Sequence, residues 1–219
     1  MSRSSRRGFG GGMTVRRGAR EFDGAPPSGA SPEELVRALA AAVVDGTTAA
    51  AEQVWGLSDH EIGRVECDQS APLADAYRCF LALMGGGAGH FMQGTDVFYP
   101  AVIGLGQAAR ELLEENNVPF VLTDSDRVIL MHQGYQFDFL RGAGSDPEVW
   151  SYCEGGGPDD VPKPSCARFT DWLQAHVTQQ TEAWARLVPW YEAEKQEEPG
   201  ERRLYFSRRH PDGSATDEL

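Results

Sequence analysis

The residues of this chain best suited to chemistry are two histidines and one cysteine. His90 and His132 could each act as a general base, and Cys153, followed by Glu154, could be a nucleophile near His132. No serine can be paired with either histidine from the sequence. A lone cysteine is more often a small apolar residue buried in the core. The sequence therefore predicts no catalytic residue and a protein that is not an enzyme.

Phosphate and metal sites are predicted to be absent as well. The stretch GGGAGHFMQG, residues 85–94, follows an expected helix and matches neither GxGxxG nor GxxxxGK, so it indicates a helix stop and a loop. Asp159 and Asp160 could bind a cation, but a solvated loop before Pro162 is the simpler interpretation. The four cysteines lack zinc-ligand spacing, which is typical of reduced thiols in a cytosolic protein. We expect no cofactor, no metal and a cytoplasmic location.

The charge of the chain is strongly and unevenly negative. The formal net charge is −13, yet residues 1–20 hold six arginines and no acid. Residues 33–177 hold 22 acids and 8 bases, a net charge of −14. A surface that binds phosphates needs concentrated lysine and arginine, so this balance argues against direct nucleic-acid binding. It favours a basic protein partner, or an acidic surface that only maintains solubility.

The elements that would position functional residues centre on the run from Pro119 to Leu140, PFVLTDSDRVILMHQGYQFDFL. Short polar residues from Thr123 to Asp126 predict a turn after a first strand at residues 120–122. A continuous apolar run at residues 128–131 predicts a strand covered on both faces, and Gln133-Gly134 predicts the next turn. Tyr135, Phe137 and Phe139 then alternate with polar residues, which predicts a strand with one buried and one solvated face.

Helical periodicity predicts the elements that surround this sheet. Serine caps open expected helices at Ser31 and Ser58, and further helices are expected over residues 73–84 and 102–116. Short strands are expected at Phe91 and at residues 97–99, and a weaker alternation at Trp150 and Tyr152 predicts one more strand. A closing helix, capped by Ser165, should place an apolar stripe on the sheet: Phe169, Trp172, Leu173 and His176.

Composition divides the chain into four parts. Residues 1–32 are rich in glycine, serine and arginine and are predicted to be disordered, with Met13 as an alternative start. Residues 33–177 form the expected domain. Residues 178–195 are an expected helix kinked near Pro189, and residues 196–219 an expected disordered tail. The apolar stretch at residues 35–44 is too short to cross a bilayer, so no membrane association is expected.

The serial order of several segments between residues 55 and 177 resembles the SUKH superfamily, which includes fungal cell-wall-assembly (Smi/Knr) regulators and bacterial immunity proteins. The segments are LSDHEIGRVE, PLADAYRCFLALMGGG, AARELLEEN before PFVLTDSDRVILM, YQFDFL, and VWSYCEGG before SCARFTDWL. Family members often have Leu-Pro before the aromatic residue of the second helix, where this chain has Pro72-Leu73. They also often have an asparagine before the glycines, where this chain has Leu83-Met84-Gly85. The resemblance implies an α+β fold with a mostly antiparallel sheet and helices packed around it. It also implies stoichiometric binding of a cognate toxin, frequently a nuclease.

The predicted partner-facing residues are acids and aromatic side chains near the turns of the sheet. Acids can match a basic cleft, and tryptophan and tyrosine are favoured at interface hot spots. The alternative for the aromatic residues is that they pack in the core. The alternative for the acids after residue 123 is that they form the turn. The predicted set is Asp124, Asp126, Trp150, Tyr152 and Glu154, with Asp96 and Asp138 behind them.

The sequence thus favours a non-enzymatic immunity protein that neutralises a polymorphic toxin, such as a basic nuclease, through an acidic surface. The alternative is a regulatory scaffold or ligand-sensing protein of the same fold. An enzyme built on His132 and Cys153 is the third hypothesis. The oligomeric state is not predicted.

Overall fold

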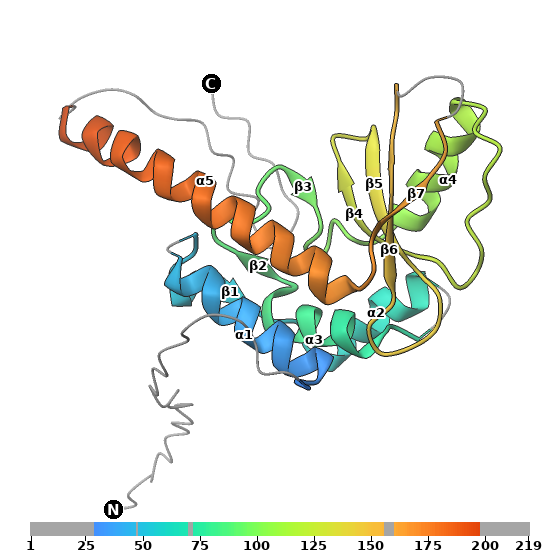
Figure 1. The fold of residues 1–219 in the computed structure, drawn as a ribbon, viewed down its shortest axis with the longest axis horizontal. Coiled ribbons are helices and arrows are strands. Elements are labelled where there is room, and N and C mark those ends of the chain that lie inside the picture. Colours follow the sequence, from blue (N-terminus) through green and yellow to red (C-terminus); the bar gives the residue numbers. More distant parts are fainter. Residues whose placement is uncertain (1–28, 47, 70–71, 156–159, 198–219) are drawn as a thin grey trace, which may run out of the picture.

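The computed structural model describes residues 29–46, 48–69, 72–155 and 160–197, and for residues 190–197 the backbone alone. The predicted disorder of residues 1–28 and 198–219 lies outside the described residues, and so does the expected loop at Asp159. Within the described part, the fold is an α+β arrangement of helices around antiparallel sheets, as predicted (Figure 1).

The first two helices begin where their capping residues predict. α1 (Pro32–Asp45) starts after Ser31, whose hydroxyl accepts a hydrogen bond from Glu34 N while the Glu34 carboxylate accepts one from Ser31 N at 2.8 Å. α2 (Asp59–Asp68) repeats this reciprocal cap with Ser58 and Glu61. Each cap satisfies backbone donors that the first helical turn leaves unpaired.

α3 (Asp75–Met84) packs on α1, α2 and α5 and is the most deeply buried of these helices. The Tyr77 and Phe80 rings lie against Phe169 of α5, with centroids 5.6 and 6.0 Å away. A short 3-10 helix (Ala51–Gln53) leads into β1 (Val54–Trp55), which pairs with β2 (Gly87–Ala88) in a small two-stranded sheet. Below the main sheet, α1, α2 and α3 thus form a layer (Figure 1), and aromatic contacts join α3 to α5.

The main sheet has five antiparallel strands in the order β3-β4-β5-β6-β7. β3 (Thr95–Asp96) is one edge and β7 (Lys163–Cys166) the other, with β4 (Arg127–His132), β5 (Gln136–Arg141) and β6 (Glu148–Cys153) between them. Phe137 pairs with Tyr152, and Phe139 with Trp150, so these four rings share one face. The register therefore assembles an aromatic face from two strands.

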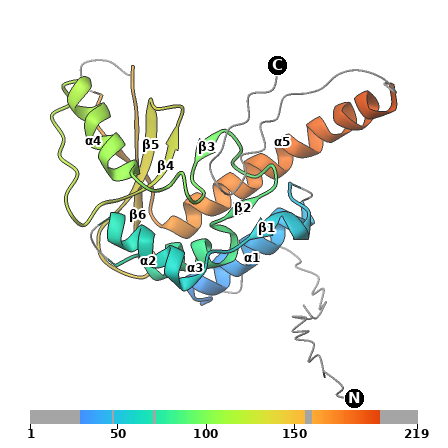
Figure 2. The same ribbon diagram turned by 180° about the vertical axis from the view of Figure 1, so that it is seen from behind.

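Helices cover both faces of this sheet. α4 (Leu105–Glu115) and α5 (Phe169–Glu197) lie on opposite sides of it in both views (Figures 1 and 2). The face predicted to be solvated carries Asp138, which is 4% exposed because Trp172 of α5 packs over it and donates a hydrogen bond to it at 2.9 Å. The prediction of one wet face was wrong, since the alternation of residues along β5 does not reveal a helix that arrives from 30 residues later.

Three smaller predictions about strands were also wrong. Residues 120–122 form no strand, and Phe120 instead packs its ring on Phe139 and Trp150. The edge strand is Thr95–Asp96 and includes neither Phe91 nor residues 97–99, although Phe91 and Val97 are fully buried. Tyr135 lies in the turn after Gln133-Gly134 and is 38% exposed, so only Phe137 and Phe139 of the predicted triplet are core residues.

α5 is one continuous helix of 29 residues that passes the expected boundary at residue 177 and contains Pro189. Ser165 is not its cap, because that residue lies in β7 and donates to Val149 O at 3.1 Å. Asp146, 24 positions before Thr170, accepts hydrogen bonds from the Thr170 amide and hydroxyl at 3.0 and 2.6 Å. The first turn is therefore capped from a distant loop. No helix in the described ranges is both long and apolar enough to cross a membrane.

Candidate functional site

Asp126, one of the predicted partner-facing acids, binds other residues of the fold through its carboxylate. Its carboxylate accepts hydrogen bonds from Thr123 N at 2.7 Å and from Arg141 Nε and Nη2 at 2.9 and 2.7 Å. Burial alone would raise the pKa of the Asp126 carboxyl, but the hydrogen bonds from Arg141 and Thr123 outweigh it and hold that pKa below its usual value. The prediction that Asp126 faces a partner is corrected, and the alternative interpretation, turn formation, applies.

Trp150 belongs to the same internal arrangement. The Arg141 guanidinium lies 4.6 Å from the centroid of Phe120 and 4.7 Å from that of Trp150, with Phe139 at 5.3 Å. The indole Nε1 of Trp150 donates to Glu148 at 2.6 Å, and the residue is half-buried. Three rings and a carboxylate thus surround one guanidinium, and Trp150, on the inner strand β6, packs within the fold and is not an open anchor for a partner.

Tyr152 and Asp138 are core residues. Tyr152 is 2% exposed and packs on Phe137 with ring centroids 5.4 Å apart. Asp138 accepts hydrogen bonds from the Ser151 hydroxyl and from the Trp172 indole. A partner could reach either side chain only after α5 or the aromatic face moved, so the structure corrects the prediction for both.

The three remaining predicted residues are exposed but do not form one patch. Asp124 lies in the turn before β4, whereas Glu154 follows β6 and its amide bonds to Tyr135 O at the other end of the sheet. The six residues of β4 separate these ends by about 20 Å. Asp96 lies on the edge strand β3. The structure therefore leaves these acids exposed without bringing them together.

A second acidic area surrounds α4 and was not singled out from the sequence. Glu111, Glu114 and Glu115 are exposed near the C-terminus of this helix, whose last turn contains no basic residue. The helix dipole disfavours carboxylates at that end. The signal was present in the sequence as ELLEE, a run of acids just before the helix stop at Asn116.

Three of the eight basic residues between residues 33 and 177 form ion pairs within the described part of the fold. Arg78 pairs with Glu66 and Asp59, Arg141 with Asp126, and Arg168 with Asp171 at 2.6 Å. These cations therefore neutralise acids next to them and contribute little to the field around α4.

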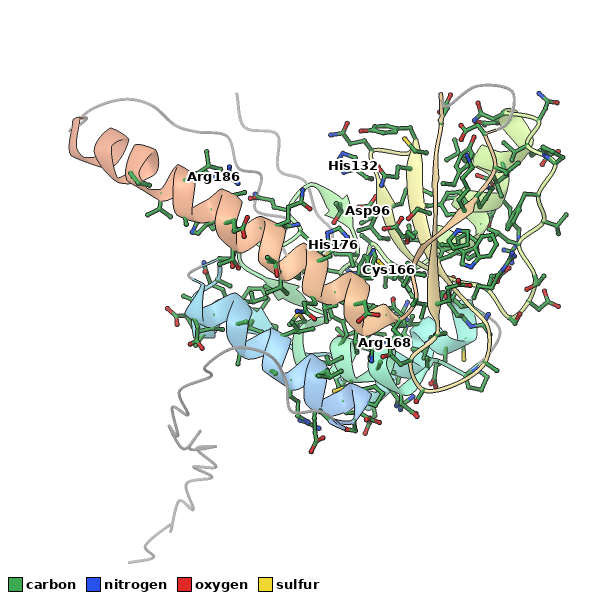
Figure 3. The ribbon with its side chains drawn as sticks, viewed as in Figure 1. Asp96, His132, Cys166, Arg168, His176 and Arg186 are labelled. Atoms are coloured by element: carbon green, nitrogen blue, oxygen red, sulfur yellow. The ribbon has the colours of Figure 1, made fainter. Side chains whose placement is uncertain are left out.

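Catalytic geometry is not assembled around His132. The register pairs His132 with Gln136 and Gln136 with Cys153, so one full strand, or about 10 Å, separates the imidazole from the thiol. Cys153 is exposed, which corrects the interpretation of it as a buried core residue. Figure 3 shows Asp96, His132 and His176 on three different elements. Within the described residues, no group of three or more potential ligands could hold a metal ion.

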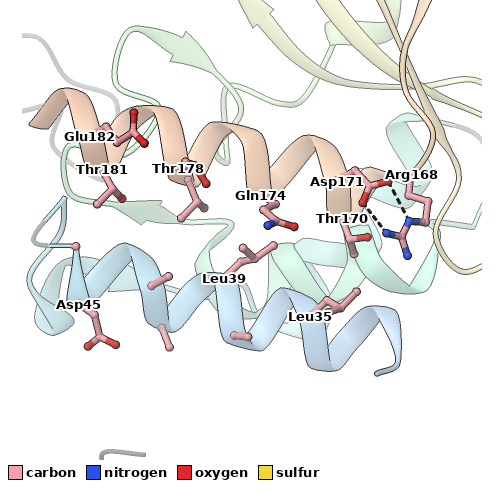
Figure 4. Close-up of a pocket in the computed structure, with 15 residues that line it drawn as sticks. Leu35, Leu39, Asp45, Arg168, Thr170, Asp171, Gln174, Thr178, Thr181 and Glu182 are labelled. Atoms are coloured by element: carbon pink, nitrogen blue, oxygen red, sulfur yellow. Dashed lines mark hydrogen bonds and ion pairs between the residues drawn. The ribbon is translucent and has the colours of Figure 1, made fainter. Parts of the chain in front are cut away.

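A groove of about 560 Å³ lies between α1 and α5. The two helices run in the same direction, so Leu35 lies near Thr170 at one end and Asp45 lies near Thr181 and Glu182 at the other (Figure 4). Three alanines of α1 and short polar residues of α5 line it, which keeps it open. Gly46 closes the far end, because a Cβ there would lie 2.5 Å from Thr181 Cγ2.

The two ends of the groove differ in charge. At the near end, Arg168 and Asp171 form a two-bonded ion pair, at 3.0 and 2.6 Å (Figure 4). At the far end, Asp45 and Glu182 are exposed, and the described residues include no ion pair to either carboxylate. The groove thus has a mainly apolar wall on α1, a mainly polar wall on α5 and two carboxylates at one end. Sequence reasoning missed it because two separate helices must meet to form it.

No family model matches this sequence, and no curated protein is detectably similar to it.

Proposed function

We propose that this chain is a non-enzymatic, immunity-type protein that binds and neutralises a cognate toxin, such as a basic nuclease, through its acidic surface. The observation that carries the proposal is the placement of Glu111, Glu114 and Glu115 at the C-terminus of α4. Carboxylates there cost helix stability, while they offer a field to a basic partner. The order of segments that resembles the SUKH superfamily supports the same function.

We favour the exposed acids Glu111, Glu114 and Glu115 as the contact with the partner, and we call them the α4 surface. Asp124 extends this surface. Asp124 lines a small hollow together with Asp68 and with Arg110, which lies in the middle of α4. Acids at the rim of an interface mainly accelerate encounter and set partner choice. This binding would be strongest at low ionic strength, because exposed charges are screened over about 8 Å at 0.15 M salt.

The direct test is co-expression with a toxin gene encoded next to this one. We expect restored growth and a stable stoichiometric complex. We also expect the Glu114→Lys/Glu115→Lys variant to bind roughly tenfold more weakly at low salt. The matched control is Asp45→Lys/Glu182→Lys, which changes the same number of charges at the α1 and α5 groove and should bind like the wild type. A toxin that is captured equally by all three proteins would refute the role of the α4 surface, and no capture at all would refute the immunity function.

A ligand-sensing protein is the second candidate, and the groove favours it. Small-molecule sites are commonly apolar hollows of about 300–1,000 Å³, a range that includes this one. A small molecule that binds there should raise the melting temperature of the wild type but not of an Ala38→Trp variant, in which the indole fills the groove. Equal stabilisation of both proteins would exclude this site.

A further inference from the structure

We propose that the small hollow between the end of α2 and the turn before β4 binds a primary ammonium group, the side-chain ammonium of a lysine on the basic partner. Asp68, Gln69 and Asp124 would accept its three hydrogen bonds. The assignment to a lysine rests on the proposed function, whereas the ammonium site itself does not depend on it.

The hollow is lined by a buried residue whose side-chain oxygen has no hydrogen-bond partner. Gln69 is 9% exposed, its Nε2 donates to Val128 O at 2.8 Å, and no group among the described residues donates to its Oε1. The two amide atoms cannot be exchanged, because Oε1 would then lie against the Val128 carbonyl oxygen. A buried acceptor without a donor costs free energy, so a ligand that brings an N–H group is favoured here.

Two exposed carboxylates line the same hollow and provide further acceptors. Asp68 Oδ2 accepts a hydrogen bond from Gly104 N at 3.0 Å, and Oδ1 has no partner among the described residues. Arg127 donates to the carbonyl oxygen of Asp124, and no described side chain pairs with the Asp124 carboxylate. An ammonium has three N–H donors and no acceptor, so it matches three oxygens that lack donors.

The charges that line the hollow favour a cation. The Asp126 carboxylate is already neutralised by Arg141. Asp68 and Asp124 then share the hollow with one cation, Arg110, whose guanidinium donates to a carbonyl oxygen of its own helix. Asp68 is also the last residue of α2, whose last turn has no basic residue, and the C-terminus of a helix attracts cations.

The size of the hollow favours lysine over arginine. Its volume is about 60 Å³, twice the roughly 30 Å³ that a water molecule occupies in the liquid. The ammonium of lysine is a compact charge on a flexible stem, whereas guanidinium is a planar fork suited to two parallel bonds with one carboxylate. An ammonium and its last methylene group fit this space, and the rest of the stem would lead out to the partner.

Nuclear magnetic resonance of the wild type tests the site with ethylammonium and tetramethylammonium chloride, each up to about 0.1 M. Both ions carry one positive charge, but tetramethylammonium has no N–H donor. We expect only ethylammonium to shift the Gln69 side-chain amide signals in a saturable way, with a dissociation constant on the order of 10 mM.

Asp124→Asn should weaken the binding of ethylammonium roughly three- to tenfold, because one carboxylate is lost. The matched control is Asp96→Asn, which removes an exposed acid from β3 and should leave the binding unchanged. Equal shifts with both ions would overturn the proposal, since they would show a response to charge alone. No saturable shift with ethylammonium would overturn it as well.

A second measurement distinguishes a lysine from a free amine. Reductive dimethylation of the toxin encoded next to this gene keeps the charge of each lysine but leaves one N–H on each ammonium. We expect the wild type to bind the dimethylated toxin roughly tenfold more weakly than the unmodified toxin, and Asp68→Asn/Asp124→Asn to bind both forms equally.

The two measurements separate failure of this site from failure of the proposed function. If the wild type binds both toxin forms equally while ethylammonium saturates the hollow, the assignment to a lysine is overturned. If no toxin complex forms and ethylammonium still binds, the immunity function is refuted and the ammonium site is supported.

Discussion

At the scale of single residues, the guanidinium of Arg141 lies between three aromatic rings and one carboxylate. Asp126 binds it through two hydrogen bonds, and Phe120, Phe139 and Trp150 lie within 5.3 Å of it. An ion pair whose acid is buried stabilises little by itself, but removal of one partner leaves the other without compensation. This arrangement explains why two predicted binding residues serve the fold.

Replacement of Asp126 by asparagine should therefore lower the free energy of unfolding by about 2 kcal/mol, because Arg141 loses its charged acceptor. Urea denaturation at pH 7 measures this change. Asp124→Asn is the control, since that carboxylate is exposed two residues away and should change stability by less than about 0.5 kcal/mol. Equal effects of the two substitutions would contradict the assignment.

His176 on α5 makes the stability of the fold depend on pH. Burial lowers its pKa below 6.5, and the charge of Asp138 only partly opposes this effect. The unfolded chain therefore binds a proton at a higher pH than the folded chain does, so stability falls as the pH drops through about 6.5. The His176 imidazole also packs edge-on against the Trp172 ring, with the two ring centroids 4.5 Å apart.

A His176→Gln variant should lose less stability than the wild type between pH 7 and pH 5, since glutamine does not titrate. Chemical denaturation at the two pH values measures the difference. His60→Gln, at an exposed position of α2, should retain the pH dependence of the wild type. An unchanged pH dependence in the His176 variant would show that this half-buried imidazole is not responsible.

At the scale of elements, α5 links the parts of the molecule. Its first turn is capped by Asp146, its Trp172 covers the sheet, and its Thr181 contacts the end of α1. One helix thus contacts the sheet, α1 and α3. The groove exists because this helix continues past the sheet alongside α1.

Gly46 sets the distance between these two helices. A methyl group at this position would lie 2.5 Å from Thr181 Cγ2 and 2.9 Å from Ala42 O, so Gly46→Ala should destabilise the protein by about 1–3 kcal/mol. Thermal unfolding measures the loss, and a second substitution, Thr181→Ala, should recover part of it. Gly63→Ala is the matched control, because nothing lies within 4 Å of a Cβ there and alanine should stabilise the interior of α2 by about 0.5–1 kcal/mol.

At the scale of the whole molecule, negative charge is the dominant surface property. The net charge of residues 33–177 is −14, and three of the eight cations in that range pair with acids within the fold. Unscreened repulsion among exposed carboxylates opposes the compact state. The same field would attract a basic partner.

Stability should therefore rise when the salt concentration increases from 0.01 to 0.15 M, because the screening length falls from about 30 to 8 Å. Urea unfolding at the two salt concentrations measures the effect. In Glu114→Lys/Glu115→Lys the rise should be smaller, since two repulsive charges have become attractive ones. A salt effect of the opposite sign would show that attractive pairs outweigh repulsion in the folded state.

The sequence by itself determined the local elements. The caps at Ser31 and Ser58, the strand at residues 128–131 and the turn at Gln133-Gly134 appear where they were predicted, because hydrogen bonds and backbone preferences within four residues decide them. The α+β class, which the resemblance implied, is the class that the structure shows.

Only the tertiary structure decided which side chains remain accessible. Asp126 and Asp124 have the same chemistry and lie two residues apart, yet Arg141, 15 residues later, buries one of them. Asp138 was expected in solvent until α5 covered it, and the groove required α1 and α5 to run side by side. Burial depends on contacts between residues far apart in the chain, and the pattern of polar and apolar residues within one element does not specify its neighbours.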